Sequence, residues 1–300
     1  MIITRRAFIE FCGKAAGACS LAGWQLAHIE EALANPSAPK VIWLHGAACS
    51  GCSVSFLNYF SPAPPASAAD VLVSSVNLLF HAGLMGAQGN LARAVIDEAL
   101  STGGYILAVE GGIPTAFNGY ACTLWEDANG NPVTCKDAVI SLAAQASMIL
   151  SIGTCASWGG VPGVAPNPAV IAGVSSVTSR STVNIAGCPP HPNWIVWGIL
   201  NAITNTIGPL DAQGRPQALY SFPNHLHASD PREPNLRVTT YGQDHCCQRY
   251  LGCRGPLTYA SCPTEKWNNA VNWCTDANTI CIGCVNHDFP GTAALRLPTS

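Results

Sequence analysis

The stretch VIWLHGAACSGC, residues 41–52, decides the fold because it joins an apolar run to two closely spaced thiols. Residues 41–44 predict a short buried β-strand, and residues 46–50 predict the loop that follows it. Cys49 and Cys52 stand at the end of this loop with a C-x-x-C spacing. Such a pair can hold one side of a metal centre or act as a redox dithiol, so the pair alone leaves both alternatives open.

The composition excludes several broad classes of protein. The chain has 300 residues, 48% of them hydrophobic, which is enough for a substantial core. Charged residues make up 10%, against a usual figure of about 25%, so we expect a partner to cover much of the surface. The net charge of −3 gives no reason to expect nucleic acid. Fifteen cysteines are too many for an ordinary cytosolic enzyme and too few for a disulfide miniprotein.

The N-terminus predicts a targeting segment. Residues 4–9, TRRAFI, form a twin-arginine pattern, and Ala32-Leu33-Ala34 is a small-residue cleavage signal. Residues 1–34 are therefore expected to be a twin-arginine signal peptide, with export to the periplasm or the outer face of the cytoplasmic membrane. The alternative is an amphipathic helix that is retained.

Strand and helix patterns alternate through residues 35–208. Strands are expected at 71–76, 105–109, 148–152 and 182–186, and helices at 91–100, 138–146 and 194–207. This alternation predicts an α/β domain with a parallel sheet covered on both faces.

Two more cysteines follow predicted strands. Cys155 comes shortly after the strand at 148–152, and Cys188 shortly after the one at 182–186. With Cys49 and Cys52 they put four thiols at the carboxyl ends of parallel strands, where open α/β sheets bind ligands. Four converging thiols fit a [4Fe–4S] cluster, with structural zinc as the alternative.

The C-terminal part, residues 209–300, is predicted to be a linker followed by an irregular cysteine-rich domain. Residues 209–234 are rich in Pro, Asp, Asn and His. The cysteines beyond them are Cys246, Cys247, Cys253, Cys262, Cys274, Cys281 and Cys284. With little helical or strand pattern, such a segment needs clusters or disulfides to order it, and we expect two further clusters.

The motifs in their order resemble those of the small, electron-transferring subunit of [NiFe] hydrogenases. They are WLHGAACSGC at 43–52, GGIP at 111–114, GTCASWGG at 153–160, GCPPHP at 187–192, CQRYLGCRGP at 247–256, CPTEKWN at 262–268 and CIGC at 281–284. The resemblance implies a flavodoxin-like domain, then an iron–sulfur domain, and a proximal [4Fe–4S] cluster on Cys49, Cys52, Cys155 and Cys188. It also implies a heterodimer with a large subunit that carries the Ni–Fe site and interconverts H2 with two protons and two electrons. No catalytic residue is expected in this chain, and a cytochrome c or membrane cytochrome is the expected acceptor.

The other two clusters are expected from the same resemblance, with departures from the family pattern. Many members have Pro where this chain has Cys274, so Cys262, Cys274, Cys281 and Cys284 predict a medial [4Fe–4S] cluster rather than [3Fe–4S]. A buried free thiol at Cys274 is the alternative. The distal [4Fe–4S] cluster is expected on His225, Cys246, Cys247 and Cys253. Ala228 stands where a Cys is usual, and His227 competes with Cys246 as the fourth ligand.

Several further positions carry expectations. Gly51 and Gly160 replace the extra cysteines of oxygen-tolerant members, so a six-thiol proximal cluster is not expected. Ala48 and Ala82 replace glutamates of many members, so carboxylate proton relays near the proximal cluster are expected to be absent. The apolar run at 293–297 is too short for a transmembrane helix, which needs about 20 residues.

One cysteine pair lies outside the predicted clusters. Cys122 and Cys135 flank the turn sequence at 127–132, so they predict a disulfide across a hairpin, with two independent thiols as the alternative. His45 and His81 are expected to be structural histidines rather than ligands.

Two other function classes remain open at this point. One is an exported iron–sulfur electron carrier without hydrogenase activity. The other is a secreted disulfide-and-zinc protein.

Overall fold

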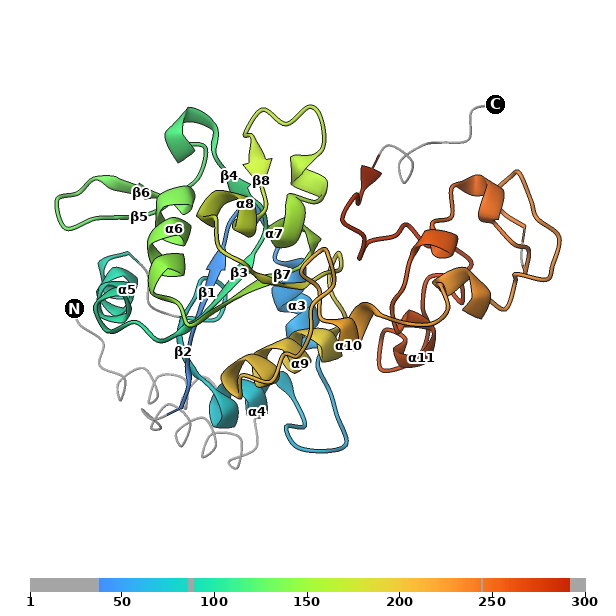
Figure 1. The fold of residues 1–300 in the computed structure, drawn as a ribbon, viewed down its shortest axis with the longest axis horizontal. Helices are drawn as coiled ribbons and strands as arrows, with labels where there is room; N and C mark the ends of the chain where they lie inside the picture. Colours follow the sequence, from blue (N-terminus) through green and yellow to red (C-terminus); the bar gives the residue numbers. More distant parts are fainter. Residues whose placement is uncertain (1–37, 86–88, 244, 292–300) are drawn as a thin grey trace, which may run out of the picture.

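Five parallel strands form the central sheet of the computed structural model, which describes residues 38–85, 89–243 and 245–291. Their spatial order is β2-β1-β3-β7-β9 (Figure 1). The strands are β1 Lys40–His45, β2 Asn77–His81, β3 Ile106–Glu110, β7 Met148–Ile152 and β9 Val183–Ile185. Counted along the chain, this is the 2-1-3-4-5 order of flavodoxin-like sheets, so the predicted α/β fold is confirmed.

Each face of the sheet has its own buried core, because successive residues of a strand point to opposite sides. Val41 and Trp43 of β1 belong to the first core, and Ile42 and Leu44 to the second. The helices over the first core are α3 (Gly51–Leu57) and α9 (Pro192–Ile203), and those over the second are α5 (Asn90–Thr102) and α6 (Cys135–Gln145) (Figure 1).

The predicted strand at 71–76 is wrong. Val71–Ser75 form a short π-helix, η1, that continues the helical turn α4 (Ala68–Asp70), and β2 begins after it. The Ser67 hydroxyl accepts a hydrogen bond from the backbone N–H of Asp70 (3.2 Å), which starts the helical turn. A short apolar run fits a buried helical turn as well as a buried strand, so the periodicity alone could not decide.

Short elements make up the rest of the described chain. Outside the main sheet, β4 pairs with β8 and β5 pairs with β6, both antiparallel. These strands are β4 Ile113–Pro114, β5 Thr123–Glu126, β6 Pro132–Thr134 and β8 Ile171–Ala172. The short helices before residue 209 are η2 Ala116–Gly119, α7 Thr154–Trp158, η3 Val161–Gly163 and α8 Val174–Thr178. Those after it are α10 Gln217–Tyr220, η4 Leu226–Ser229, η5 Arg249–Leu251, η6 Gly255–Leu257 and α11 Cys262–Glu265.

The segment predicted as a linker packs against the edge of the sheet. The backbone N–H of Asn184 in β9 donates to the carbonyl of Gly214 (2.8 Å). The Tyr220 hydroxyl donates to the carbonyl of Ala186 (2.8 Å). The first core continues into the C-terminal part through Leu219, Tyr220, Leu226, Ala260, Trp273 and Val285. The sheet and the cysteine-rich part therefore share one core.

Two predictions concern residues outside the described ranges: the signal peptide at 1–34 and the apolar run at 293–297. Within the described ranges, no helix has both the length and the apolar character needed to cross a bilayer.

Candidate metal centre

Four cysteines come together at the edge of the sheet where β1, β7 and β9 end. Cys49 and Cys52 follow β1, Cys155 lies in α7 after β7, and Cys188 follows β9. The thiols of Cys155 and Cys188 are hydrogen-bonded to each other, and Cys52 feels the charges of Cys49 and Cys188. The structure thus brings together all four predicted proximal ligands. We call them the proximal thiols.

Two glycines let the backbone approach these thiols closely. Gly153 has a φ of 91°, and a β-carbon there would lie 2.6 Å from the sulfur of Cys52. Gly160 has a φ of 52°, and a β-carbon there would lie 2.8 Å from the sulfur of Cys155. Any other residue would be strained at these positions and would fill the space around the sulfurs.

Burial and neighbouring thiols oppose ionisation of Cys52 and Cys155. Burial raises the pKa of Cys52, and the nearby Glu110, Cys188 and Cys49 raise it further. The hydrogen bond from Cys155 lowers the pKa of Cys188 to about 7, and the same bond raises the pKa of Cys155. Thiolates are the forms that bind metal, so a cationic metal core between the four would offset their repulsion.

A buried carboxylate that the sequence analysis did not foresee lies behind the C-x-x-C turn. Glu110, the last residue of β3, is 1% exposed. It accepts hydrogen bonds from the backbone N–H groups of Cys52 and Ser53 (both 3.1 Å), the Ser53 hydroxyl (2.5 Å) and the Trp43 indole (3.2 Å). It therefore satisfies N–H groups in the first turn of α3. The signal in the sequence was a Glu that ends an otherwise apolar strand.

Glu110 places a carboxylate near Cys52 although positions 48 and 82 hold alanines. The absence of carboxylate proton relays at those two positions stays a prediction.

His45 and His81 are held by hydrogen bonds in the same layer, as expected for structural histidines. The backbone N–H of Gly83 donates to Nδ1 of His81 (3.0 Å). Nε2 of His81 and Nε2 of His45 each lie 3.2 Å from the Ser53 hydroxyl oxygen. Burial, with the neighbouring His45, lowers the pKa of His81 to about 4, so this ring is neutral at neutral pH.

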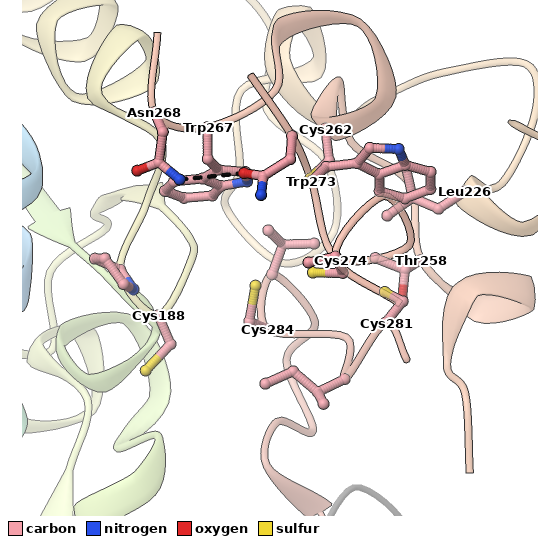
Figure 2. A pocket seen from close by; sticks show the side chains of 15 residues that line it. Cys188, Leu226, Thr258, Cys262, Trp267, Asn268, Trp273, Cys274, Cys281 and Cys284 are labelled. Carbon is pink, nitrogen blue, oxygen red and sulfur yellow. Dashed lines mark hydrogen bonds between the residues drawn. The ribbon is translucent and has the colours of Figure 1, made fainter. Parts of the chain in front are cut away.

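Four further cysteines line a cavity of about 380 Å³ in the C-terminal part. These medial thiols are Cys262, Cys274, Cys281 and Cys284. Figure 2 shows Cys274, Cys281 and Cys284 around the same space, with Cys188 across from them. Burial raises the pKa of all four, to about 12 for Cys281 and Cys284, and neighbouring thiols raise each one further. Cys274 therefore lies with the other three.

Hydrogen bonds connect the proximal and medial thiols. The Thr154 hydroxyl donates to the carbonyl of Cys284 (2.5 Å) and accepts from the backbone N–H of Gly187 (2.9 Å). The backbone of Cys188 is also hydrogen-bonded to the Cys284 thiol. Thr154 and Gly187 each directly precede a proximal cysteine. A short path of covalent and hydrogen bonds therefore connects the proximal thiols to the medial thiols.

The third predicted site involves Cys247, Cys253 and a histidine. Cys247 is buried, and the charge of Cys253 acts on the medial thiols Cys274 and Cys281. A β-carbon on Gly255 would lie 3.3 Å from the β-carbon of His227 and 3.4 Å from the sulfur of Cys253. His227 and Cys253 are therefore neighbours.

The two candidate histidines differ in how their ring nitrogens are used. His227 is 5% exposed, and neither of its buried ring nitrogens has a hydrogen-bond partner. Glu233 Oε1 is 3.8 Å from its Nε2, beyond hydrogen-bonding distance. In His225, Nδ1 accepts a hydrogen bond from the backbone N–H of Ala228 (3.1 Å). This hydrogen bond uses the Nδ1 lone pair of His225, whereas both ring nitrogens of His227 are without a hydrogen-bond partner.

Cys246 and Cys247 differ in burial. Cys247 is buried and pairs in an isolated bridge with Arg237, whereas Cys246 is partly exposed. The distal role of Cys246 stays a prediction.

The donor atoms fit iron–sulfur clusters. Both the proximal and the medial group supply four thiols, and soft thiolates are the ligands that such clusters take. In the described ranges, no three His, Cys, Asp or Glu side chains lie close enough together to hold a single metal ion. The medial thiols instead surround a cavity, which a cluster of several irons requires.

Comparisons with known proteins agree with this chemistry along the whole chain. Residues 49–202 match the family model described as NADH ubiquinone oxidoreductase, 20 Kd subunit. Residues 232–296 match the model that describes the C-terminal region of the NiFe/NiFeSe hydrogenase small subunit. The two models together cover the sheet from β2 onward and most of the cysteine-rich part.

Individual relatives match over nearly their full length. The periplasmic [NiFeSe] hydrogenase small subunit of Desulfomicrobium baculatum is 34% identical over 97% of each chain. The periplasmic [NiFe] hydrogenase small subunit of Solidesulfovibrio fructosivorans is 35% identical over 96% of this chain and 90% of that one. Among solved structures, the recombinant [NiFeSe] hydrogenase of Desulfovibrio vulgaris Hildenborough matches with a TM-score of 0.79 and 32% identity, over 88% of this chain and 98% of that one.

A flavodoxin-like sheet with thiol-lined sites in series defines an iron–sulfur electron-transfer protein. The chain belongs to the family of small subunits of [NiFe] and [NiFeSe] hydrogenases. It is thus the electron-transfer subunit of a hydrogenase, which pairs with a large subunit.

Proposed function

We propose that this chain holds three iron–sulfur clusters in series between the large subunit and an external acceptor. Cys49, Cys52, Cys155 and Cys188 would hold the proximal [4Fe–4S] cluster. Cys262, Cys274, Cys281 and Cys284 would hold the medial one. The distal [4Fe–4S] cluster would be held by Cys247, Cys253 and a histidine, with Cys246 as the predicted fourth ligand. When bound, the clusters supply one-electron carriers.

The contacts that link the proximal thiols to the medial thiols, and the medial thiols to Cys253, are the observation that carries this proposal. Cys188 of the proximal group contacts Cys284 of the medial group. Cys253 of the distal group acts electrostatically on Cys274 and Cys281 of the medial group. Every transfer along this series is thus between neighbouring groups.

The residues around the thiols have two tasks in this proposal. Thr154 fixes the distance between the proximal and medial groups, because its hydroxyl links the start of α7, which carries Cys155, to the carbonyl of Cys284. Glu110 fixes the C-x-x-C turn through the backbone N–H groups of Cys52 and Ser53. Its negative charge would also favour the oxidised, less negative state of a nearby cluster.

Between the two histidines, the free ring nitrogens favour His227 as the distal ligand over the predicted His225. A buried imidazole without a hydrogen-bond partner is costly, and a metal bond would offset this cost. The hydrogen bond that Nδ1 of His225 accepts from Ala228 works against a ligand role for that ring.

The medial cluster is proposed to be [4Fe–4S] because Cys274 supplies a thiol at the fourth corner. An extra thiolate adds negative charge, which should lower the potential of this cluster relative to [3Fe–4S]. A lower potential would keep the reduction potentials of the three clusters close together and would favour reversible electron transfer to a low-potential acceptor. A c-type or membrane cytochrome is the proposed acceptor.

The same proposal includes export. The small subunits of Desulfomicrobium baculatum and Solidesulfovibrio fructosivorans are described as periplasmic, and residues 1–34 of this chain carry the twin-arginine pattern. The folded heterodimer would cross together, and the segment up to about Ala34 would be removed. Intact-mass measurement of the exported protein tests this step, and a mass that retains residues 1–34 would refute cleavage.

Site-directed removal of one proximal thiol tests the core of the proposal. Cys188→Ser should lower the iron and acid-labile sulfide content of the purified heterodimer and uncouple H2-dependent dye reduction from the large subunit. Cys122→Ser is the control, because Cys122 lies outside the three groups. Normal iron content and normal H2 uptake in Cys188→Ser would overturn the proximal assignment. If the chain were instead an exported carrier without hydrogenase activity, the wild-type protein would contain iron but would not co-purify with a nickel-containing partner.

A further inference from the structure

Two cysteines that the clusters do not use face each other across the β5–β6 hairpin. Cys122 directly precedes β5 and Cys135 directly follows β6, and the backbone N–H of Cys135 donates to the carbonyl of Cys122 (2.8 Å). Their thiols are in hydrogen-bonding contact with each other. The sequence suggested this pairing, and the structure brings the two side chains together.

The position of this pair keeps it away from the iron–sulfur chemistry. Cys135 belongs to the second core, on the sheet face opposite the one that continues into the cysteine-rich part, and Cys122 packs against the same core. Figure 1 shows the hairpin on the far side of the sheet from α11. Neither thiol has a cluster ligand among the groups that shift its pKa.

We propose that Cys122 and Cys135 form a disulfide in the mature protein, which closes the hairpin onto the start of α6. The proposal rests on the proposed export only for its oxidant, a thiol oxidase protein that carries a reactive disulfide.

The two thiols differ in a way that suits thiol–disulfide exchange. Cys122 is partly exposed, and the hydrogen bond from Cys135 lowers its pKa to about 7. Cys135 is fully buried, and the same bond and its burial raise its pKa. Cys122 is therefore the thiol that an external oxidant reaches first, as the thiolate.

The disulfide would form by thiol–disulfide exchange in two steps. The Cys122 thiolate attacks one sulfur of the oxidase disulfide, which forms a mixed disulfide and releases one oxidase thiolate. The Cys135 thiolate then attacks the Cys122 sulfur and releases the second oxidase thiolate. The two thiols lose two protons and two electrons in total, and the disulfide of the oxidase becomes a dithiol.

The consequence is local and structural. Cys135 is the first residue of α6, and the Thr134 hydroxyl caps this helix by accepting from the backbone N–H of Asp137 (3.0 Å). A covalent link at Cys135 would hold the hairpin, the cap and the helix start together and restrict the unfolded chain.

The sequence offers a clean mass-spectrometric test on the wild-type heterodimer. No Lys or Arg lies between Arg93 and Lys136, so the tryptic peptide 94–136 contains both cysteines and no other. Free thiols are blocked with N-ethylmaleimide at lysis, before any reduction. We expect an unblocked peptide that is lighter than the dithiol form by two hydrogens. Cleavage after Glu126 should then give two halves that stay joined until a reductant is added.

The results that would overturn the disulfide differ from those that would overturn the proposed function. A peptide blocked at both cysteines before reduction would overturn the disulfide, whatever the iron content. Missing iron with an intact disulfide would overturn the clusters and leave this inference standing.

As a second readout, reduction should lower the melting temperature of the wild type by about 5 °C and leave the melting temperature of a Cys122→Ser/Cys135→Ser variant unchanged. Equal melting before and after reduction of the wild type would also count against the disulfide.

Discussion

His227 shows how one side chain can point to a missing bond. Its ring is almost fully buried, and both nitrogens lack hydrogen-bond partners, next to the thiol of Cys253. Leaving a buried polar group unpaired costs about 1–3 kcal/mol, and native proteins rarely accept this cost without a reason. Coordination to iron would supply one.

Glutamine substitutions at the two histidines separate the candidates. His227→Gln should remove the histidine nitrogen coupling to the distal cluster, seen by pulsed electron paramagnetic resonance of ¹⁵N-histidine-labelled protein, and should lower the iron content. His225→Gln should leave both unchanged, because its Nδ1 already accepts from Ala228. The reverse pattern would assign the distal ligand to His225.

The proposed type of the medial cluster depends on Cys274. Oxidised [3Fe–4S] is paramagnetic and oxidised [4Fe–4S]²⁺ is not, so gently oxidised wild type should lack a stoichiometric [3Fe–4S] signal. Cys274→Pro should create that signal and raise the medial potential, because one thiolate is lost. Cys122→Ser should leave the spectrum unchanged. A full-strength [3Fe–4S] signal in undamaged wild type would mean that Cys274 is not a ligand.

His81 makes stability depend on pH. Burial lowers its pKa to about 4 in the folded state, from about 6.5 in the unfolded chain. The unfolded state therefore binds a proton first, so stability is complete above pH 6.5 and falls as the pH drops towards 4. Between pH 8 and pH 5 the loss from this group is about 2 kcal/mol.

Comparison with a variant isolates this contribution. The unfolding midpoints of wild type and His81→Asn should converge as the pH falls from 8 to 5, since only wild type carries the penalty. Parallel pH profiles for the two proteins would show that His81 is not the group responsible.

At the scale of the elements, the end of β3 holds the start of α3. Glu110 ends the strand and accepts from two backbone N–H groups in the first turn of the helix that carries Cys52. A carboxylate near a helix N-terminus is favourable, and here the burial of Glu110 is compensated by hydrogen bonds from Ser53 and Trp43. These hydrogen bonds therefore hold the end of β3 and the C-x-x-C turn in a fixed arrangement.

Removal of this carboxylate should destabilise the protein. Glu110→Ala leaves two buried N–H groups and an indole without acceptors, which should cost about 3 kcal/mol. Glu126 also ends a strand but is exposed, so Glu126→Ala should stay within about 0.5 kcal/mol of wild type. Chemical unfolding of both variants gives the comparison. Equal stability of the two would mean that the contacts of Glu110 contribute nothing net.

The sequence predicted those elements whose pattern is strong and local. The strand at 148–152 has the predicted bounds, and the helices at 138–146 and 194–207 are present with shifted ends. Apolar runs bounded by turn residues carry this information. The run at 71–76 was too short to tell a strand from a helical turn.

The candidate site was predictable as far as it depends on cysteine spacing and strand ends. The role of Glu110 could not be predicted, because its partners Trp43, Cys52 and Ser53 lie 67, 58 and 57 positions away in the chain. The difference between His225 and His227 was also hidden, since it depends on which ring nitrogen meets a backbone N–H. Spacing identifies ligands that come in patterns, whereas contacts made across the fold require the structure.

At the scale of the whole molecule, the proximal thiols open to the surface beside α3. Cys49 is exposed, and so are the apolar side chains of Val54, Leu57 and Phe60 on and just after this helix. A groove of about 800 Å³ runs alongside, between α3 and the segment that follows α11. Exposed apolar side chains around a redox site suit a permanent protein partner, so we expect the large subunit to cover this face.

A matched pair of leucines tests this face. Leu57 in α3 is 49% exposed and Leu91 in α5 is 46% exposed, but the two helices cover opposite faces of the sheet. Leu57→Asp would place a charge in the contact with the large subunit and should reduce co-purification at least about tenfold, since central apolar contacts contribute about 2 kcal/mol or more. Leu91→Asp should co-purify like wild type. If both variants lose the large subunit equally, the charge acts through folding, and if neither does, the large subunit binds another face.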